Sequence, residues 1–230
     1  DSAFDPMNRR LKPSAVGARR APADLDSSGA SRLWAITSYF NPIGYARRRA
    51  NYAEFRRRLT VPLITVELAY DGRFDLPDDA AEILIRIPGK DVIWQKERLL
   101  NLALRALPAH CDRIAWLDCD IVFEDPDWGA RSCEALERFE LIQPFDRVYE
   151  SPPDAGPDWR PGGDEPATRS AAQRPRMSFG YAFSVDPAAA TELMQSESRF
   201  VSICTSGMAW AARRELIEPA GFYDACVGGS

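Results

Sequence analysis

Short apolar runs alternate with helix-forming segments along this chain, and that alternation constrains the fold more than any other feature. Strands are predicted at 33–37, 63–68, 82–87, 114–117 and 140–143. Helices are predicted at 45–58, 92–107, 127–139 and 209–218. Strands that alternate with helices build βαβ units and therefore a parallel sheet. The sequence thus predicts an α/β fold with a mostly parallel central sheet flanked by helices.

The composition excludes several classes of protein. A net charge of −5 argues against a nucleic-acid partner, because nucleic-acid binders usually present a basic face. The five cysteines form no closely spaced pair, which favours reduced thiols over disulfides or a zinc site. No apolar run approaches the roughly 20 residues that span a bilayer. We therefore expect a cytoplasmic protein without a transmembrane segment.

The chain divides into a leader and one large domain. Residues 1–32 are rich in Arg, Pro, Ala, Ser and Asp without a sustained period, so we predict a flexible leader followed by a domain over 33–230. Residues 151–176 contain six prolines and three glycines. Such a segment is either an active-site lid or simply disordered, and both interpretations are open.

Two acidic residues follow the most apolar of the predicted strands. Asp118 and Asp120 flank Cys119 directly after the run 114–117. In a parallel sheet, ligands bind beyond the carboxyl ends of the strands, and two carboxylates there form a hard-oxygen site that suits Mg²⁺ or Mn²⁺ bridged to a diphosphate. Residues 37–42 and Glu67 are predicted at two further strand ends. A solvated strand-end turn is the alternative that the acidic pair alone leaves open.

A predicted helix precedes this strand and carries a lysine near its start. Helix N-termini favour anions, so Lys96 there could hold a diphosphate. Trp94, Arg98, Asn101 and Arg105 have spacings that place them on one face of the helix. The alternative is a surface helix with scattered charges.

Together these segments resemble the GT-A glycosyltransferases, which have a Rossmann-like fold, and especially their β-1,4-galactosyltransferase-like branch. The resemblance begins with 94–101 followed by 114–120, where the family has a basic residue, then Leu-Leu-Asn on a helix, ahead of its Asp-x-Asp strand. Upstream, Asn41 and Pro42 followed by three arginines resemble the first nucleotide-binding loop. Downstream, 206–215 with 221–222 resembles a second block of the family.

The resemblance implies metal-dependent transfer of a glycosyl group from a nucleotide diphosphate sugar to a glycan or another hydroxyl acceptor. A UDP-sugar is the expected donor, and Mn²⁺ or Mg²⁺ on Asp118 and Asp120 the expected cofactor. The donor-binding residues that it implies are Asn41, Pro42, Arg47, Arg48, Arg49, Glu67, Lys96, Asn101 and Asp118. Glu67 is expected to hydrogen-bond the base or the ribose.

The chain's end is expected to bind the acceptor. Gly228 and Gly229 resemble the family's Trp-Gly-Gly-acidic segment, although Val227 replaces its tryptophan. The family's catalytic base follows the two glycines, so the domain is expected to be truncated at its C-terminal end, with the base beyond residue 230 and an inverting mechanism. If the chain nevertheless transfers sugar, the carboxylates to test are Glu215, Glu218 and Asp224.

Two other functions compete with this interpretation. A haloacid dehalogenase-type phosphohydrolase also has Asp-x-Asp after an apolar strand, but on its first strand. A non-catalytic nucleotide- or glycan-binding domain of the same fold would need no base. His110, the single histidine, is expected to be a plain surface residue.

Overall fold

The computed structural model describes residues 32–70, 72–89, 92–93, 95–152, 156, 159, 175–195, 200 and 203–225. Several sequence-based expectations lie outside these residues. They are nearly all of the leader 1–32, most of the 151–176 segment, and the acceptor-binding pair Gly228 and Gly229.

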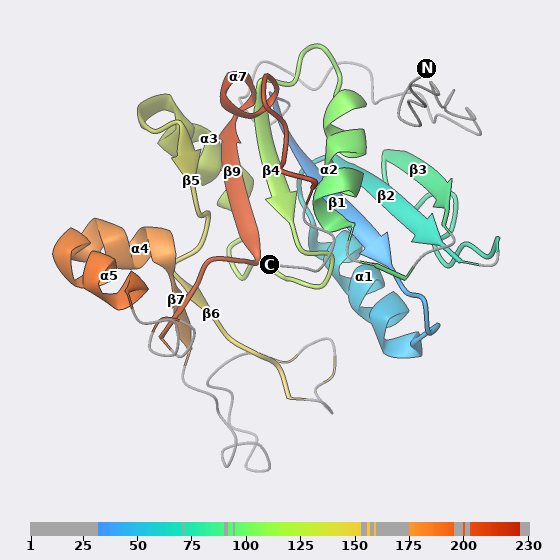
Figure 1. The fold of residues 1–230 in the computed structure, drawn as a ribbon, viewed down its shortest axis with the longest axis horizontal. Helices are drawn as coiled ribbons and strands as arrows, with labels where there is room; N and C mark the ends of the chain where they lie inside the picture. The colour runs from blue at the N-terminus through green and yellow to red at the C-terminus, as the bar shows by residue number, and fades with distance from the viewer. Residues whose placement is uncertain are drawn as a thin grey trace, which may run out of the picture.

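Within the described residues the central sheet has six strands in the order β3-β2-β1-β4-β9-β5 (Figure 1). The strands are β1 (Leu33–Phe40), β2 (Leu63–Ala69), β3 (Ile83–Pro88), β4 (Arg113–Leu117), β5 (Leu141–Ile142) and β9 (Ala209–Arg213). Neighbours among β3, β2, β1 and β4 pair in parallel, whereas β9 is antiparallel to both β4 and β5. The predicted α/β fold with a mostly parallel central sheet flanked by helices is confirmed.

Helices cover both faces of this sheet, because alternate residues of each strand point to opposite sides. Leu33, Ala35 and Tyr39 of β1 pack in one core with α1 (Ala46–Arg58) and α3 (Trp128–Arg138). Trp34 and Ile36 pack in the other core with α2 (Lys96–Arg105). Figure 1 shows α2 in front of the sheet. This layering places the start of α2 near the carboxyl ends of β1 and β4.

A smaller unit lies beside the β5 edge of the sheet in Figure 1. It contains a three-stranded sheet of β6 (Arg147–Val148), β7 (Arg176–Ser178) and β8 (Cys204–Thr205), with helices α4 (Phe179–Val185) and α5 (Pro187–Met194). Ser178 and Asp186 cap the two helices by accepting hydrogen bonds from Tyr181 N and Ala189 N. None of the described helices combines the length and apolar character needed to cross a bilayer.

The helix predicted at 209–218 is wrong over its first half. Residues 209–213 form β9, and only α7 (Arg214–Ile217) is helical. The alanines of this segment favour a helix in isolation, but β9 fills the slot between β4 and β5, where Ala209, Ala211 and Ala212 are buried. Tertiary pairing therefore overrides local propensity here.

Candidate functional site

A cavity of about 170 Å³ opens at the carboxyl ends of β1, β2 and β4, and we call it the donor cavity. Its lining combines charged groups with apolar walls. The lining residues are Ser38, Phe40, Arg48, Leu68, Ile93, Gln95, Lys96, Leu99, Leu117, Asp118, Cys119 and Asp120. The position agrees with the rule that ligands bind beyond the carboxyl ends of parallel strands. Both acidic residues singled out by sequence therefore lie in one recess with two cationic side chains.

Asp118 is the first residue after β4, and its carboxylate forms an ion pair with Lys96. Lys96 is the first residue of α2, so its predicted place near a helix start is confirmed. Each of the two side chains is 29 % exposed, which leaves the pair reachable from solvent. The Asp118 N–H donates to Met208 O at 2.8 Å, which ties the strand end to the segment before β9.

Asp120 lines the donor cavity and is exposed as a whole residue. Surrounding protein nevertheless withdraws water from its carboxyl group, and this desolvation raises the pKa of Asp120 above the ordinary value. The nearby charge of Asp118 raises it further, while Arg48 and Lys96 act in the opposite direction. The negative charges of the two carboxylates therefore repel each other.

The three arginines of the first turn of α1 point to different places. Arg48 lines the donor cavity and acts electrostatically on Asp120. Arg49 instead donates to Gly44 O at 3.2 Å and lies 3.6 Å from the Asp75 carboxylate. Arg47 is exposed and outside the donor-cavity lining. Of the three predicted donor-binding arginines, the structure brings Arg48 to the acidic pair.

The donor set fits a divalent metal that takes its remaining ligands from elsewhere. Within the described residues no group of three or more His, Cys, Asp or Glu side chains could hold a metal ion alone. Two carboxylates plus phosphate and water oxygens are, however, the usual environment of Mg²⁺ beside a diphosphate. The mutual repulsion of Asp118 and Asp120 also favours a cation between them. Arg48 and Lys96 formally balance the charges of these two carboxylates, so the cavity lining by itself has no excess positive charge to attract an anion.

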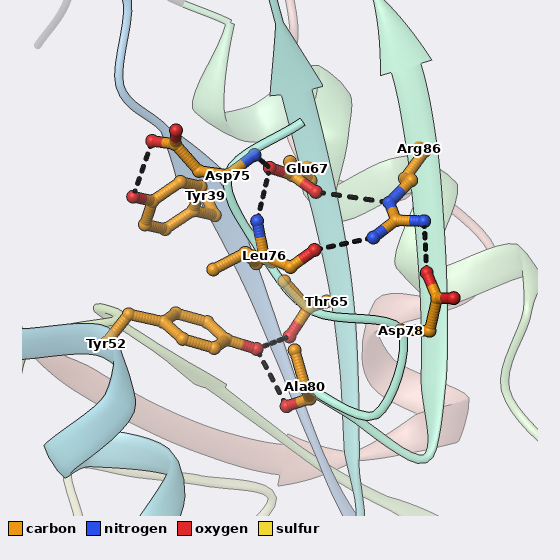
Figure 2. A network of polar contacts seen from close by, with 9 residues as sticks. All are labelled: Tyr39, Tyr52, Thr65, Glu67, Asp75, Leu76, Asp78, Ala80 and Arg86. Carbon is orange, nitrogen blue, oxygen red and sulfur yellow. Dashed lines mark hydrogen bonds and ion pairs between the residues drawn. The ribbon is translucent and has the colours of Figure 1, made fainter. Parts of the chain in front are cut away.

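Two further predicted donor-binding residues are engaged by the protein itself. Glu67 lies inside β2 rather than at its end, is 1 % exposed, and accepts hydrogen bonds from Asp75 N and Leu76 N (Figure 2). Asn41 accepts from Tyr45 N at 2.9 Å and donates to Asp75 at 2.7 Å. Their predicted contacts with a nucleotide stay predictions, as does that of Pro42, which is half-buried beside Asn41.

Asn101 was expected on the charged face of its helix, and the structure instead buries it. Its side chain donates to Phe222 O and accepts from Phe222 N, both at 2.8 Å, and also donates to Asp224 at 3.2 Å. Gly221 has a φ of 67°, and a Cβ there would come within 2.8 Å of Asn101 Oδ1. Two segments of the family resemblance thus meet through this amide, although 121 residues separate Asn101 from Phe222.

The three carboxylates named above as candidate bases occupy two different regions. Glu215 and Glu218 line a second cavity of about 620 Å³, at the amino end of β4, which we call the amino-end cavity. Its other lining residues are Arg32, Ala109, Cys111, Asp112, Arg113, Leu136, Glu137, Arg213 and Arg214. Asp224 lies on the α2 side of the sheet, next to Asn101. Glu215 and Glu218 are therefore at the wrong end of the sheet to act as a base at the donor cavity.

The sequence analysis missed the apolar and aromatic surroundings of the site. Phe40 forms an edge-to-face contact with Tyr70 at the donor cavity, with ring centroids 5.3 Å apart. Trp116 and Trp210 stack on β4 and β9, 6.3 Å apart and 11° from parallel. Met208 has a φ of 75°, an uncommon conformation for a residue with a Cβ, beside Asp118. Phe40 lies in the predicted strand-end segment 37–42, but no local pattern there indicates an aromatic wall, and Trp116 lies within a run that indicates only a buried strand.

The expectation for His110 is met, since its side chain is exposed and touches the edge of Trp34. The four described cysteines, Cys111, Cys119, Cys133 and Cys204, are buried. Burial raises the pKa of the Cys119 thiol to about 12, so the residue between the two aspartates is an inert, neutral packing group.

No family model matches the chain, and no curated protein matches it in sequence. Among solved structures it is similar to the mannosyltransferase PcManGT from Pyrobaculum calidifontis, solved with GDP-Man and Mn²⁺. The TM-score is 0.46 and the identity 14 %, over 84 % of this chain and 48 % of that one. The chain thus spans about half the length of that transferase.

It is also similar to 4-diphosphocytidyl-2C-methyl-D-erythritol synthase from Anaerococcus prevotii DSM 20548. There the TM-score is 0.41 and the identity 13 %, over 84 % of this chain and 74 % of that one. The fold class rests on the strand order and strand directions given above. The β-1,4-galactosyltransferase-like branch indicated by the motifs stays a prediction.

Proposed function

We propose that this chain binds a nucleotide diphosphate sugar together with a divalent metal in the donor cavity, and that its fold serves glycosyl transfer. One observation carries the proposal. Asp118, Asp120, Lys96 and Arg48 come from three separate elements and converge in a single cavity at the carboxyl ends of the strands. A metal that adds two positive charges to this balanced set would leave it complementary to a diphosphate.

Each charged residue then has a separate role. Asp118 and Asp120 would hold Mn²⁺ or Mg²⁺, which supplies Lewis-acid stabilisation of the leaving diphosphate. Lys96 and Arg48 would donate hydrogen bonds to the same diphosphate as its charge develops. Phe40, Leu68 and Leu99 form apolar walls of the cavity, where the base can pack. A UDP-sugar is the proposed donor and a glycan the proposed acceptor, by the resemblance of the motifs.

The remaining roles follow the family resemblance alone. Gly228 and Gly229 would let the acceptor approach the backbone closely, since neither has a Cβ. A carboxylate would deprotonate the acceptor hydroxyl with inversion. Pro42, Arg47 and Arg49 would belong to the donor-binding loop, with Arg48 as its cavity residue.

The proposal is tested by calorimetric titration of UDP with and without Mn²⁺. Binding should require the metal, and Asp120→Asn should weaken it roughly tenfold or more, which corresponds to about 1.4 kcal/mol. The matched control is Asp79→Asn, which neutralises an exposed carboxylate outside the donor cavity and should leave affinity unchanged. Equal UDP affinity in wild type and Asp120→Asn would refute the proposal.

Turnover separates the competing functions. Release of sugar from a UDP-sugar with Mn²⁺ supports a transferase, whereas phosphate release from p-nitrophenyl phosphate would indicate a phosphohydrolase. Tight metal-dependent binding of UDP without either reaction would identify a nucleotide-binding domain of the same fold.

A further inference from the structure

The loop between β2 and β3 is held to both strands by polar contacts. Glu67 Oε1 accepts hydrogen bonds from Asp75 N at 2.5 Å and from Leu76 N at 3.0 Å. Its other oxygen faces Arg86 Nε at 3.4 Å, and Arg86 also donates to Leu76 O and Asp78 (Figure 2). Two backbone N–H groups on one nearly buried carboxylate fix the path of the loop. The position of Asp75 is therefore set by β2 rather than by the loop itself.

From this position Asp75 reaches across to the end of β1. Its carboxylate accepts hydrogen bonds from Tyr39 Oη at 3.1 Å and Asn41 Nδ2 at 2.7 Å. Figure 2 shows the Tyr39 contact. Asn41 in turn accepts from Tyr45 N at 2.9 Å and donates to Tyr45 O at 3.2 Å. Asp75 is thus linked through Asn41 to the turn from which α1 starts.

Helix α1 needs such support, because its first turn is electrostatically unfavourable. Arg47, Arg48 and Arg49 place three positive charges where the helix dipole is itself positive. The first turn contains no acidic residue, and the N-cap Tyr45 has no side-chain capping bond. Asp75 supplies the missing negative charge from outside the helix, with its carboxylate 3.6 Å from Arg49 Nη1.

This arrangement leaves Arg48 available to the donor cavity. Arg49 is engaged by Asp75 and by Gly44 O, while Arg48 has no ion pair or side-chain hydrogen bond within the part of the chain that the structure describes. Arg48 nevertheless lines the cavity and acts on Asp120. An unpaired guanidinium can bind a diphosphate effectively only if the helix turn that carries it is held in place.

From these contacts we infer that Asp75 is a positioning residue that holds the first turn of α1 so that Arg48 enters the donor cavity. Glu67 and Asn41 were both expected from sequence to contact the nucleotide. Here Glu67 fixes the backbone of Asp75, and Asn41 connects the Asp75 carboxylate to Tyr45 at the start of α1. The inference rests on the proposed function, since it assigns Arg48 to a bound diphosphate. Asp75 itself lies outside the donor-cavity lining.

A double-mutant cycle tests this coupling. Mn²⁺-dependent UDP affinity is measured for Asp75→Asn, Arg48→Ala and the double variant. Each single change is expected to weaken binding roughly tenfold or more, the size of one charge-assisted hydrogen bond. Because Asp75 acts through Arg48, the double variant should be no weaker than Arg48→Ala alone. Fully additive losses would overturn the inference.

Two controls separate positioning from general loss of structure. Asp78→Ala removes a carboxylate from the same loop that contacts Arg86 and is 86 % exposed, so it should leave UDP affinity unchanged. Affinity for uridine, which lacks the diphosphate, should be unchanged in Asp75→Asn. A parallel loss of uridine and UDP binding would assign Asp75 a merely structural role and overturn the inference.

A measurement without ligand keeps the inference separable from the proposed function. If wild type fails to bind Mn²⁺ and UDP, the proposed function fails, and amide hydrogen exchange still tests the positioning. Exchange at Tyr45 and Arg48 should be faster in Asp75→Asn than in Asp78→Ala, because the turn loses its support. Equal exchange in the two variants would overturn the inference.

Discussion

The donor cavity and the amino-end cavity lie at opposite ends of β4 and carry the same formal charge balance, but they pair their charges differently. In the amino-end cavity each arginine has its own carboxylate nearby. The pairs are Arg32–Asp112, Arg113–Glu137, Arg213–Glu215 and Arg214–Glu218. In the donor cavity Lys96 and Asp118 pair, whereas Arg48 and Asp120 have no ion pair among the described residues.

The difference shows that charge content alone does not mark a binding site. Paired charges satisfy one another and stabilise the fold, while unpaired charges in a recess keep their interaction capacity for a ligand. The amino-end cavity is the larger of the two, at about 620 Å³ against about 170 Å³. Pairing, rather than size, therefore favours the smaller cavity as the functional one.

The largest effect that would sharpen this comparison concerns Arg214 in the amino-end cavity. Its Nη1 donates to Pro108 O at 2.8 Å and Cys111 O at 3.1 Å, and its Nη2 donates to Glu218. Arg214→Ala should lower the free energy of unfolding by about 2 kcal/mol, because two backbone acceptors lose a charged donor. Urea unfolding measures the loss, and UDP affinity should stay unchanged.

The control for Arg214 is Arg131→Ala. Arg131 is 77 % exposed and forms an ion pair with Asp125 at 3.0 Å, so its loss should change stability by less than about 0.5 kcal/mol. If Arg214→Ala weakened Mn²⁺-dependent UDP binding in folded protein, the assignment of a purely structural role to the amino-end cavity would be wrong.

A smaller effect is expected from the paired lysine of the donor cavity. Lys96→Ala should weaken UDP binding roughly fivefold, about 1 kcal/mol, and leave uridine binding unchanged, because Lys96 faces the diphosphate. Binding of Mn²⁺ alone should become tighter, since a cation beside Asp118 is removed. Calorimetry on each ligand separates these outcomes.

Arg98→Ala is the matched control for Lys96, because Arg98 lies on the exposed face of the same helix. It should leave all three affinities unchanged. Equal losses of UDP and uridine in Lys96→Ala would place the lysine at the base and contradict its assignment to the diphosphate.

The smallest expected effect is a shift in pH dependence. Desolvation and the charge of Asp118 raise the pKa of Asp120, so protons compete with Mn²⁺ at a higher pH than at an ordinary aspartate. Affinity for Mn²⁺ should fall as the pH drops through this raised pKa. Arg48 lowers the pKa of Asp120, so Arg48→Ala should raise that pKa. The loss of Mn²⁺ affinity should then begin at a still higher pH.

The same shift has a defined sign for stability. The pKa of Asp120 is higher in the folded chain than in the unfolded chain, so protonation of Asp120 favours folding. This contribution to the free energy of unfolding is present at low pH and is lost as the pH rises through the folded-state pKa. Manganese titrations by electron paramagnetic resonance over a series from acidic to neutral pH test the binding. An identical pH profile in Asp120→Asn would show that another group titrates.

Much of the fold could be predicted because it depends on local patterns. The runs that form β1, β2, β3 and β4 are apolar and β-branched, and helix-forming segments separate most of them, so strand positions and sheet type followed. The pair Asp118 and Asp120 was found because it directly follows such a run. Lys96 was found because it lies close to a helix start, although α2 begins four residues later than predicted.

Other parts of the site could not be predicted, because they depend on partners distant in sequence. Asn101 has the spacing of a surface position, but Phe222 and Asp224 turn it into a buried link. Glu67 could have met a ligand at a strand end, but the loop after β2 folds back onto it. No pattern near either residue contains that information.

The sequence by itself determined the alternation of strands and helices, the sheet type and the place of the acidic pair, since these follow from hydrophobic period and from the geometry of parallel strands. The tertiary structure decided which of the three arginines faces the acidic pair, and that Ala209–Arg213 is a strand rather than a helix. The physical reason is that Asp75 engages Arg49, and that β4 and β5 leave a slot in which small side chains fit. Both outcomes depend on contacts between segments that only the folded chain brings together.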